Sequence, residues 1–295
     1  MRRAALLLAA LLASASPAAA QEKPLTSAEI VKAAGPADWR TPDPENTLYM
    51  ELEGGRVVIE LAARLVPNHA ANIRTLVREG WFDGLAIVRV QENYVTQWGD
   101  PTEKKPVRNG KKQLPAEFLA PNGAALPFAK LPDGDVYAPE VGFVDGFPVG
   151  RDPATGAVWP LHCYGMVGAG RDMTADSGSG AELYAVIGQA PRHLDRNMTV
   201  VGRVLKGMEL LTALPRGTGP LGFYETPEQR RPITAVRLAA DVPEAERTKL
   251  EVLRTDTATF AAYIESRRNR REPFFLVPLG KVDVCNVPLV TRDKP

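Results

Sequence analysis

Residues 83–101 have the sequence DGLAIVRVQENYVTQWGDP, in which Arg89 and Gln97 stand inside an otherwise apolar and aromatic run. Alternation along residues 85–90 predicts a strand whose odd positions share one face and whose even positions share the other. A charged side chain in such a strand needs a partner or a cleft, because an unpaired buried charge is very costly. Either Arg89 pairs with an acid such as Asp100, or it faces a functional cleft.

The residues upstream predict a hairpin followed by a helix. Residues 48–52 and 57–61 are two apolar or alternating runs joined by Gly54 and Gly55, which is typical of a β-hairpin. Pro67 suits the first turn of a helix, where a missing N–H does no harm, and Gly80 suits its end. Between them one apolar stripe is formed by Ala70, Ile73, Leu76 and Val77.

The central stretch resembles the active-site signature of the cyclophilin-type peptidyl-prolyl isomerases, whose usual form is F-H-R-V-I-P-G-F-M-I-Q-G-G-D. Residues 87–100 of this chain are IVRVQENYVTQWGD. The arginine (Arg89), the valine after it, the glutamine (Gln97) and the final Gly-Asp keep their places, and Tyr94 keeps an aromatic ring. The Phe-His pair is lost, and Val95 stands where the family has methionine.

The resemblance continues in three later blocks and covers roughly residues 47–240. Residues 165–170 are similar to the family strand L-S-M-A-N-A-G, residues 180–184 to G-S-Q-F-F, and residues 194–208 to the closing segment of the barrel. Residues 233–238 would form the last strand. The resemblance implies a mainly β fold: a closed eight-stranded antiparallel cyclophilin-like barrel capped by two helices, here followed by a C-terminal helical extension.

The resemblance also implies a site and a reaction. Rotation about an X-Pro bond must overcome amide resonance, and an arginine directed at the prolyl nitrogen weakens that resonance. Arg89 takes this role by resemblance, and Gln97 orients it. No metal, nucleophile or redox cofactor is needed. The positions that would contact a proline-containing peptide are Tyr94, Val95, Val167, Gly168, Tyr184, His193, Leu194 and Met198. One register is open, because Ala185 could occupy the proline cup in place of Tyr184.

Several family residues are replaced, so more than one function is considered. His193 stands at the family's groove tryptophan, Met198 at its groove histidine, and Gly168 at an asparagine, while Val167 replaces a smaller alanine. The first hypothesis is a prolyl isomerase that assists the folding of exported proteins. The alternative is a peptide-binding or chaperone module with weak or absent catalysis, and a third is an envelope-assembly adaptor that binds a partner through residues 241–295.

The first twenty residues predict a signal peptide. Arg2 and Arg3 precede a short apolar run, and three alanines ending at Ala20 fit a cleavage site before Gln21. The run is too short to span a membrane, and no other stretch is long enough, so we expect a periplasmic or secreted protein. Removing Arg2 and Arg3 lowers the formal net charge of +1 by two, to −1, which argues against nucleic acid as a partner.

Three segments lie outside the family pattern. Residues 21–46 form an arm in which Thr26 and Glu29 predict a capping box and a short helix. Residues 102–161 are an insertion, expected as an elaborated loop beside the substrate groove, with a hairpin at residues 142–147. Residues 241–295 are expected to form one helix from Pro243 to about Arg270 and two short strands at residues 274–277 and 281–284. The arginines at the end of that helix suit its macrodipole better than a nucleic-acid site.

The two cysteines and the acids of the insertion leave alternatives open. Cys163 and Cys285 form one disulfide in the exported protein, or remain two buried thiols. The acids of the insertion are compatible with calcium, but they lack regular ligand spacing, which favours solvated turns. The three histidines show no zinc-ligand spacing. These acids and histidines are Asp133, Asp135, Glu140, Asp145 and Asp152, with His69, His162 and His193.

Overall fold

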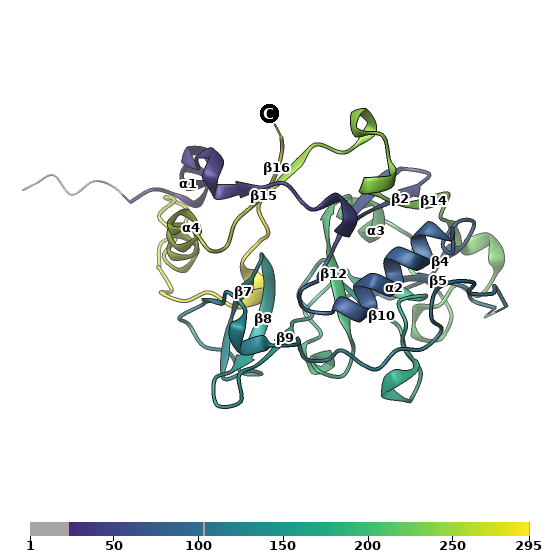
Figure 1. The fold of residues 1–295 in the computed structure, drawn as a ribbon. Helices are drawn as coiled ribbons and strands as arrows, with labels where there is room; N and C mark the ends of the chain where they lie inside the picture. The colour runs from purple at the N-terminus through teal and green to yellow at the C-terminus, as the bar shows by residue number, and fades with distance from the viewer. Residues whose placement is uncertain (1–23, 103, 295) are drawn as a thin grey trace, which may run out of the picture.

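The computed structural model describes residues 24–102 and 104–294, so the expected signal peptide lies outside the described residues. The main feature is a curled nine-stranded antiparallel sheet in the order β13-β4-β5-β11-β10-β12-β3-β2-β14 (Figure 1). Its strands are β2 (Thr47–Leu52), β3 (Gly55–Leu61), β4 (Ala86–Val90), β5 (Val95–Gly99), β10 (Met166–Ala169), β11 (Leu183–Val186), β12 (Val200–Lys206), β13 (Arg231–Pro232) and β14 (Ala235–Leu238). The expected mainly β antiparallel architecture is confirmed.

The two edges of this sheet meet at residues 231–238. The first part of the segment, β13, pairs with β4, and the second part, β14, pairs with β2. Between them the amide of Ile233 donates to the carbonyl of Leu85 (2.8 Å), and that of Thr234 to the carbonyl of Glu51 (3.0 Å). When β13 and β14 are taken as one interrupted strand, the sheet has the expected eight strands.

The predicted hairpin and helix are both present. In the β2–β3 hairpin, Leu48, Met50, Val57 and Ile59 enter the main core, as alternation requires. Helix α2 (Pro67–Arg78) begins at Pro67 and covers β14 with its predicted stripe, whose side chains are all buried. A second, short helix, α3 (Met208–Thr212), packs against β3.

The outer face of the β2–β3 hairpin is buried as well. Tyr49 and Val58 point away from the main core and pack against Leu250 and Val252 of the C-terminal segment. Those residues belong to strand β15 (Leu250–Leu253), which pairs with β1 (Trp39–Arg40) on one side and β16 (Thr291–Asp293) on the other. The N-terminal arm and the C-terminal segment therefore share one small sheet that covers the barrel.

The N-terminal arm forms the predicted helix α1 (Ser27–Ala33), and Thr26 and Glu29 make the predicted capping box. Helix α1 packs against α4 (Ala258–Arg268), where the hydroxyls of Ser27 and Ser266 are 2.8 Å apart. Figure 1 shows α1, α4 and the inserted strands on one side of the molecule, away from β4 and β5.

The insertion forms a four-stranded sheet of β6 (Ala129–Lys130), β7 (Glu140–Val144), β8 (Phe147–Asp152) and β9 (Ala157–Pro160). Asp145 and Gly146, both at positive φ, make the tight turn between β7 and β8, which confirms the predicted hairpin. Among the described residues that line the hollow at Arg89, none comes from the insertion. The insertion therefore contains a sheet at residues 129–160, and in the described structure it supplies no lining residue to this hollow.

The turn at Asp145 and Gly146 is where the added segments meet the barrel. Arg40 donates to the carbonyl of Asp145 (2.9 Å), and the amide of Gly146 donates to the hydroxyl of Thr255 (3.0 Å). Arg203 of β12 donates to the carbonyl of Gly146. Burial lowers the pKa of Arg203 to about 10, with a further lowering from Arg40 and an opposing effect of Glu60.

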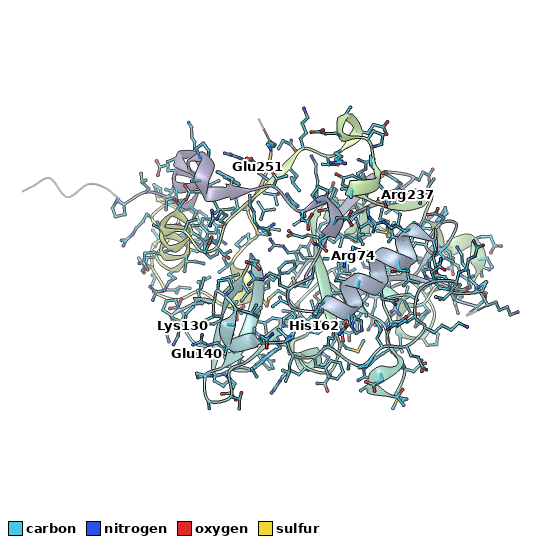
Figure 2. The ribbon with its side chains drawn as sticks, viewed as in Figure 1. Arg74, Lys130, Glu140, His162, Arg237 and Glu251 are labelled. Carbon is cyan, nitrogen blue, oxygen red and sulfur yellow. A yellow bond between two sulfur atoms is a disulfide. The ribbon has the colours of Figure 1, made fainter. Side chains whose placement is uncertain are left out.

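Four of the five acids of the insertion are ion-paired, which corrects the expectation of solvated turns for those four, whereas Asp152 accepts the backbone amide of Ala154 in the turn after β8. Figure 2 shows Lys130 and Glu140 together on the inserted sheet, where their side chains are 2.6 Å apart. Further pairs join Glu140 to Arg151, Asp133 to Arg268, Asp135 to Arg192 and Asp145 to Arg64. In the described part of the chain, no group of three or more His, Cys, Asp and Glu side chains is arranged to hold a metal ion.

The C-terminal extension corrects the predicted single helix. Residues 250–253 form β15 because Leu250 and Val252 alternate toward a buried face, with the period of two that is typical of a strand. Helix α4 begins only after Thr257, whose hydroxyl accepts the amide of Phe260 as an N-cap. The strands expected at residues 274–277 and 281–284 are absent from this described segment, where Phe274, Leu276 and Val277 are exposed.

The structure joins Cys163 and Cys285 in a disulfide. The two cysteines therefore form a disulfide and are not two separate buried thiols. Cys163 lies just before β10 and Cys285 lies in the C-terminal extension, so the bond ties the extension to the barrel.

Candidate active site

A bulge in β4 decides where Arg89 lies. Ile87 pairs with Trp98, and Arg89 pairs with Gln97, so Val88 is an extra residue that pairs with no residue of β5. Without the bulge, Gln97 would face Val88. The bulge also breaks the alternation, because Ile87 and Val90 both enter the core while Arg89 faces outward. The predicted placement of Ile87 and Arg89 on one face is therefore wrong.

The guanidinium of Arg89 is fixed by three oxygen acceptors. Its Nε donates to the carbonyl of Leu221 (2.7 Å), its Nη1 to Oε1 of Gln97 (2.9 Å) and its Nη2 to Oε1 of Gln91. The carboxylate of Asp100 instead accepts backbone amides of its own loop, at Thr102 and Lys105. The structure does not show the alternative pairing of Arg89 with Asp100.

Arg89 is half-buried between aromatic rings. Its Cζ lies 5.2 Å from the ring centroid of Phe223 and 5.5 Å from that of Tyr94, within the range of cation–π attraction. Burial lowers the pKa of Arg89, and the charges of Tyr94 and Glu182 oppose that effect. Since arginine starts from so high a pKa, the side chain stays a cation at neutral pH.

A hollow of about 150 Å³ opens beside Arg89. The predicted site residues that line it are Arg89, Gln97, Tyr94, Val95, Tyr184, Leu194 and Met198. Tyr184 lines the hollow, while Ala185, the next residue of β11, is buried in the barrel core. Tyr184 packs with Val95, Val186, Tyr94 and Met198 in a small apolar cluster of its own.

Three predicted contact residues lie outside the hollow. Val167 is buried in the core, because its side chain points to the inner face of β10. Gly168 pairs with Tyr184, and a Cβ at this position would lie 2.2 Å from Cζ of the tyrosine ring. His193 stacks on Tyr94, with ring centroids 6.5 Å apart and planes 8° apart. Gly168 and His193 therefore adjoin the hollow through its lining side chains.

Sequence reasoning missed several residues of the site. Glu182 accepts the amide of Gln97, which fixes the orientation of the glutamine that holds Arg89. Its position inside the recognised block at residues 180–184 was the available signal. Phe223 and Leu221 come from an irregular connection between α3 and β13 that carries no pattern, and only the folded chain brings them to Arg89. Gly170 and Arg171 also line the hollow.

Tyr184 is held from behind by a histidine. Its hydroxyl lies 2.9 Å from Nε2 of His162, and the two rings stack with planes 9° apart. Burial, with smaller effects of Tyr94 and Asp195, raises the pKa of Tyr184, so the hydroxyl keeps its proton. Tyr184 therefore lines the hollow while its hydroxyl is hydrogen-bonded inside the protein.

The family model of the cyclophilin type peptidyl-prolyl cis-trans isomerase/CLD matches residues 47–239. The chain belongs to this family. The match spans the strands from β2 to β14 and includes the insertion, while the N-terminal arm and the extension lie outside it. The chain is therefore a cyclophilin-type peptidyl-prolyl cis-trans isomerase by family, with additional segments at both ends.

Individual relatives agree with this membership. A Brucella suis protein named a probable peptidyl-prolyl cis-trans isomerase is 29% identical over 181 residues, covering 60% of this chain and 74% of the relative. The human peptidyl-prolyl cis-trans isomerase-like 1 is 25% identical over 209 residues, covering 70% and 96%. The crystal structure of cyclophilin AquaCyp293 from Hirschia baltica superposes with a TM-score of 0.69 at 26% identity, covering 88% of this chain and 96% of that one.

The structure adds one finding about membranes. In residues 24–102 and 104–294, no helix combines the length and the apolar character needed to cross a bilayer.

Proposed function

We propose that this cyclophilin isomerises X-Pro bonds in exported proteins as they fold, with Arg89 as the catalytic residue. The observation that carries the proposal is the fixed guanidinium of Arg89 at the edge of an apolar hollow. The hollow offers Tyr94, Val95, Tyr184, Leu194 and Met198 to a proline ring.

Isomerisation needs a group that binds the twisted peptide better than the planar one. Amide resonance sets a barrier of roughly 18–20 kcal/mol. A donor directed at the prolyl nitrogen stabilises a pyramidal nitrogen with a localised lone pair, which occurs only in the twisted state. An arginine has five N–H groups, and the bonds to Leu221, Gln97 and Gln91 use three of them. The other N–H groups remain for the peptide.

The orientation of Arg89 depends on Gln97. The glutamine accepts from Arg89 through its oxygen and donates to Glu182 through its nitrogen. With these two partners, the side-chain oxygen of Gln97 faces Arg89 and its nitrogen faces Glu182, and the guanidinium is held in one position. In the proposed mechanism Gln97 positions Arg89 and also hydrogen-bonds the backbone of the peptide.

The proposal that the protein is exported rests on one sequence prediction and two observations. The first is the signal peptide predicted over residues 1–20, with cleavage after Ala20. The second is the Cys163–Cys285 disulfide, since disulfides persist in oxidising compartments such as the periplasm. The third is a Synechocystis relative named for the thylakoid lumen, which is 24% identical over 184 residues, covering 58% of this chain and 44% of the relative.

A second candidate function is favoured by the residues that the site has lost. Ile87 and Val88 replace the Phe-His pair, and His193 and Met198 replace the tryptophan and histidine of the groove. A site that keeps the apolar hollow and loses these groups could bind proline-containing segments with little turnover. The two functions differ in whether exchange is accelerated.

NMR exchange spectroscopy on a proline-containing peptide tests both. With the mature chain, residues 21–295, we expect accelerated cis–trans exchange that disappears in Arg89→Ala. Arg237→Ala is the matched control, because Arg237 is also a strand arginine but pairs with Asp83 at the surface, and it should leave exchange unchanged. Full exchange in Arg89→Ala would remove Arg89 from the mechanism, and broadened peptide lines without accelerated exchange would establish the binding module.

A further inference from the structure

The ring of Tyr184 stands at one end of a continuous chain of buried polar contacts that ends in the insertion. His162 Nδ1 lies 3.0 Å from Oδ1 of Asp195, which also accepts the backbone amide of His162 (2.9 Å). The other oxygen of Asp195 accepts Nε of Arg192 at 2.5 Å. Arg192 then donates through Nη1 and Nη2 to the two oxygens of Asp135, each at 2.9 Å.

Every member of this chain is removed from solvent. The side chain of His162 is 0% exposed, and those of Asp195, Arg192 and Asp135 are 6%, 4% and 1% exposed. In such surroundings hydrogen bonds are stronger than in water, and an unpaired member is expensive. This row of hydrogen-bonded side chains is therefore paired along its whole length, so the loss of one member changes the hydrogen bonds of the others.

The hydrogen-bond directions follow from the chemistry of the groups. Asp195 accepts only, so Nδ1 of His162 carries a proton and donates to it. The hydroxyl of Tyr184, whose pKa is raised by burial, keeps its proton and donates to Nε2 when that nitrogen carries no proton. The ring of Tyr184 is thus anchored in one orientation by a donor bond to a fixed histidine.

The insertion contributes the terminal carboxylate. Asp135 lies between β6 and β7, whereas Tyr184 lies on β11 and lines the hollow. His162 follows the last inserted strand, β9, and lies between the inserted sheet and the barrel (Figure 2). Arg192 also covers the ring of Tyr137 from the same inserted segment, at 5.0 Å.

We propose that the inserted segment positions Tyr184 against the bound proline through Asp135, Arg192, Asp195 and His162, and so sets how tightly the groove holds its peptide. These four are positioning residues, because none of them lines the hollow in the described structure. The inference rests on the proposed function, since it takes the hollow to be the proline site.

Removal of the charge on Asp135 would change the hydrogen bonds along this row of side chains. Without that carboxylate, Arg192 keeps only Asp195 as its charged partner in the chain and competes with His162 for both oxygens. His162 then loses the bond that orients its ring, and the hydroxyl of Tyr184 loses a fixed acceptor. The apolar wall of the hollow becomes mobile, while the bonds that hold Arg89 are untouched.

The experiment compares Asp135→Asn with Asp133→Asn. Both aspartates lie in the same inserted segment, both are nearly buried, and both pair with an arginine, but Asp133 pairs with Arg268 of α4, away from the groove. By NMR titration and exchange spectroscopy we expect Asp135→Asn to raise the peptide dissociation constant roughly threefold to tenfold, within the range of coupling in one hydrogen-bond network. The exchange rate of the bound peptide should stay within about twofold, and Asp133→Asn should leave both quantities unchanged.

A double-mutant cycle separates positioning from general destabilisation. Tyr184→Phe removes the hydroxyl that connects the ring to His162, so Asp135→Asn should have no further effect on peptide affinity in the Tyr184→Phe background. An equal loss in both backgrounds, or an equal loss from Asp133→Asn, would overturn the proposal. Should Asp135→Asn not fold, Arg192→Lys tests the same chain, because lysine keeps the charge but cannot bridge both carboxylates.

The outcome also separates this inference from the proposed function. If Tyr184→Ala weakens peptide binding while Asp135→Asn does not, the proline site stands and only the positioning chain fails. If Tyr184→Ala and Arg89→Ala both leave binding and exchange unchanged, the hollow is not the proline site.

Discussion

Reduction of the Cys163–Cys285 disulfide should lower stability by a large and calculable amount. The bond closes a loop with a sequence separation of 122 residues. In the chain-entropy model, closing a loop of this size lowers the entropy of the unfolded chain and so raises the free energy of unfolding by about 4.9 kcal/mol at 25 °C. That value is comparable with a substantial part of the whole stability of an ordinary domain, which is roughly 5–15 kcal/mol.

The assay is urea unfolding of the oxidised and the reduced protein, followed by tryptophan fluorescence. With a denaturant slope of roughly 2–3 kcal/mol per molar, the loss corresponds to a midpoint lower by about 1.6–2.5 M. Comparison of the two redox states is cleaner than substitution, since Cys163 is buried in the main core and its truncation would add a packing cost. Thiol titration of the unfolded protein verifies each state.

Cys285→Ala serves as the control for the reductant. It lacks the bridge from the start, so reductant should not shift its midpoint. Equal midpoints for oxidised and reduced wild-type protein would refute the reasoning, because they would show that the bond does not restrict the unfolded chain. Two separate transitions in the reduced protein would show that the extension and the barrel unfold independently once the bond is broken.

Two other predictions concern residues around the site and its supporting helix. Gly168→Ala should destabilise the protein by about 1–3 kcal/mol and weaken peptide binding, because its Cβ overlaps the ring of Tyr184. Urea unfolding of Gly168→Ala and of the double variant Gly168→Ala/Tyr184→Ala checks this. If alanine at position 184 does not restore the stability lost in Gly168→Ala, the overlap is not the cause. Glu117 accepts the amides of Asn68 and His69 and the ring of His69 at the start of α2; burial raises its pKa, but these hydrogen bonds outweigh burial and hold it below the usual 4.5. Its stabilising effect is therefore complete above pH 4.5 and lost as the pH falls below that value toward the folded pKa. Glu117→Gln should cost about 1–3 kcal/mol at pH 7 and flatten that part of the stability profile, and thermal unfolding from pH 7 to pH 3 would show an unchanged profile if the reasoning were wrong.

The sequence predicted the elements whose patterns are local. The β2–β3 hairpin needs only two alternating runs and a glycine pair, α2 needs a proline, a stripe and a glycine, and α1 needs the capping box of Thr26 and Glu29. Each of these signals lies within a few residues of the element it specifies. The same holds for the inserted hairpin at Asp145 and Gly146.

Prediction failed where a local pattern had two readings. Leu250 and Leu253 fit a helical stripe, yet residues 250–253 form a strand because β1 and β16, from opposite ends of the chain, offer unpaired edges on either side. Thr257 lies inside the helix expected from Pro243 to about Arg270, but it is the N-cap of α4. The sequence of residues 250–253 is compatible with a helix or a strand, and pairing with β1 and β16 selects the strand.

By itself, the sequence determined the family resemblance and singled out the residues proposed here for a proline site: one arginine, one glutamine and the apolar positions of four recognisable blocks. Only the tertiary structure decided how they meet. The bulge at Val88 sets Arg89 opposite Gln97, and the patternless connection that carries Leu221 and Phe223 completes the setting of the guanidinium. The physical reason is that Leu221 lies 132 residues from Arg89 in the chain, and that the local contact of Arg89 with Gln97 depends on a strand register that the sequence pattern does not encode.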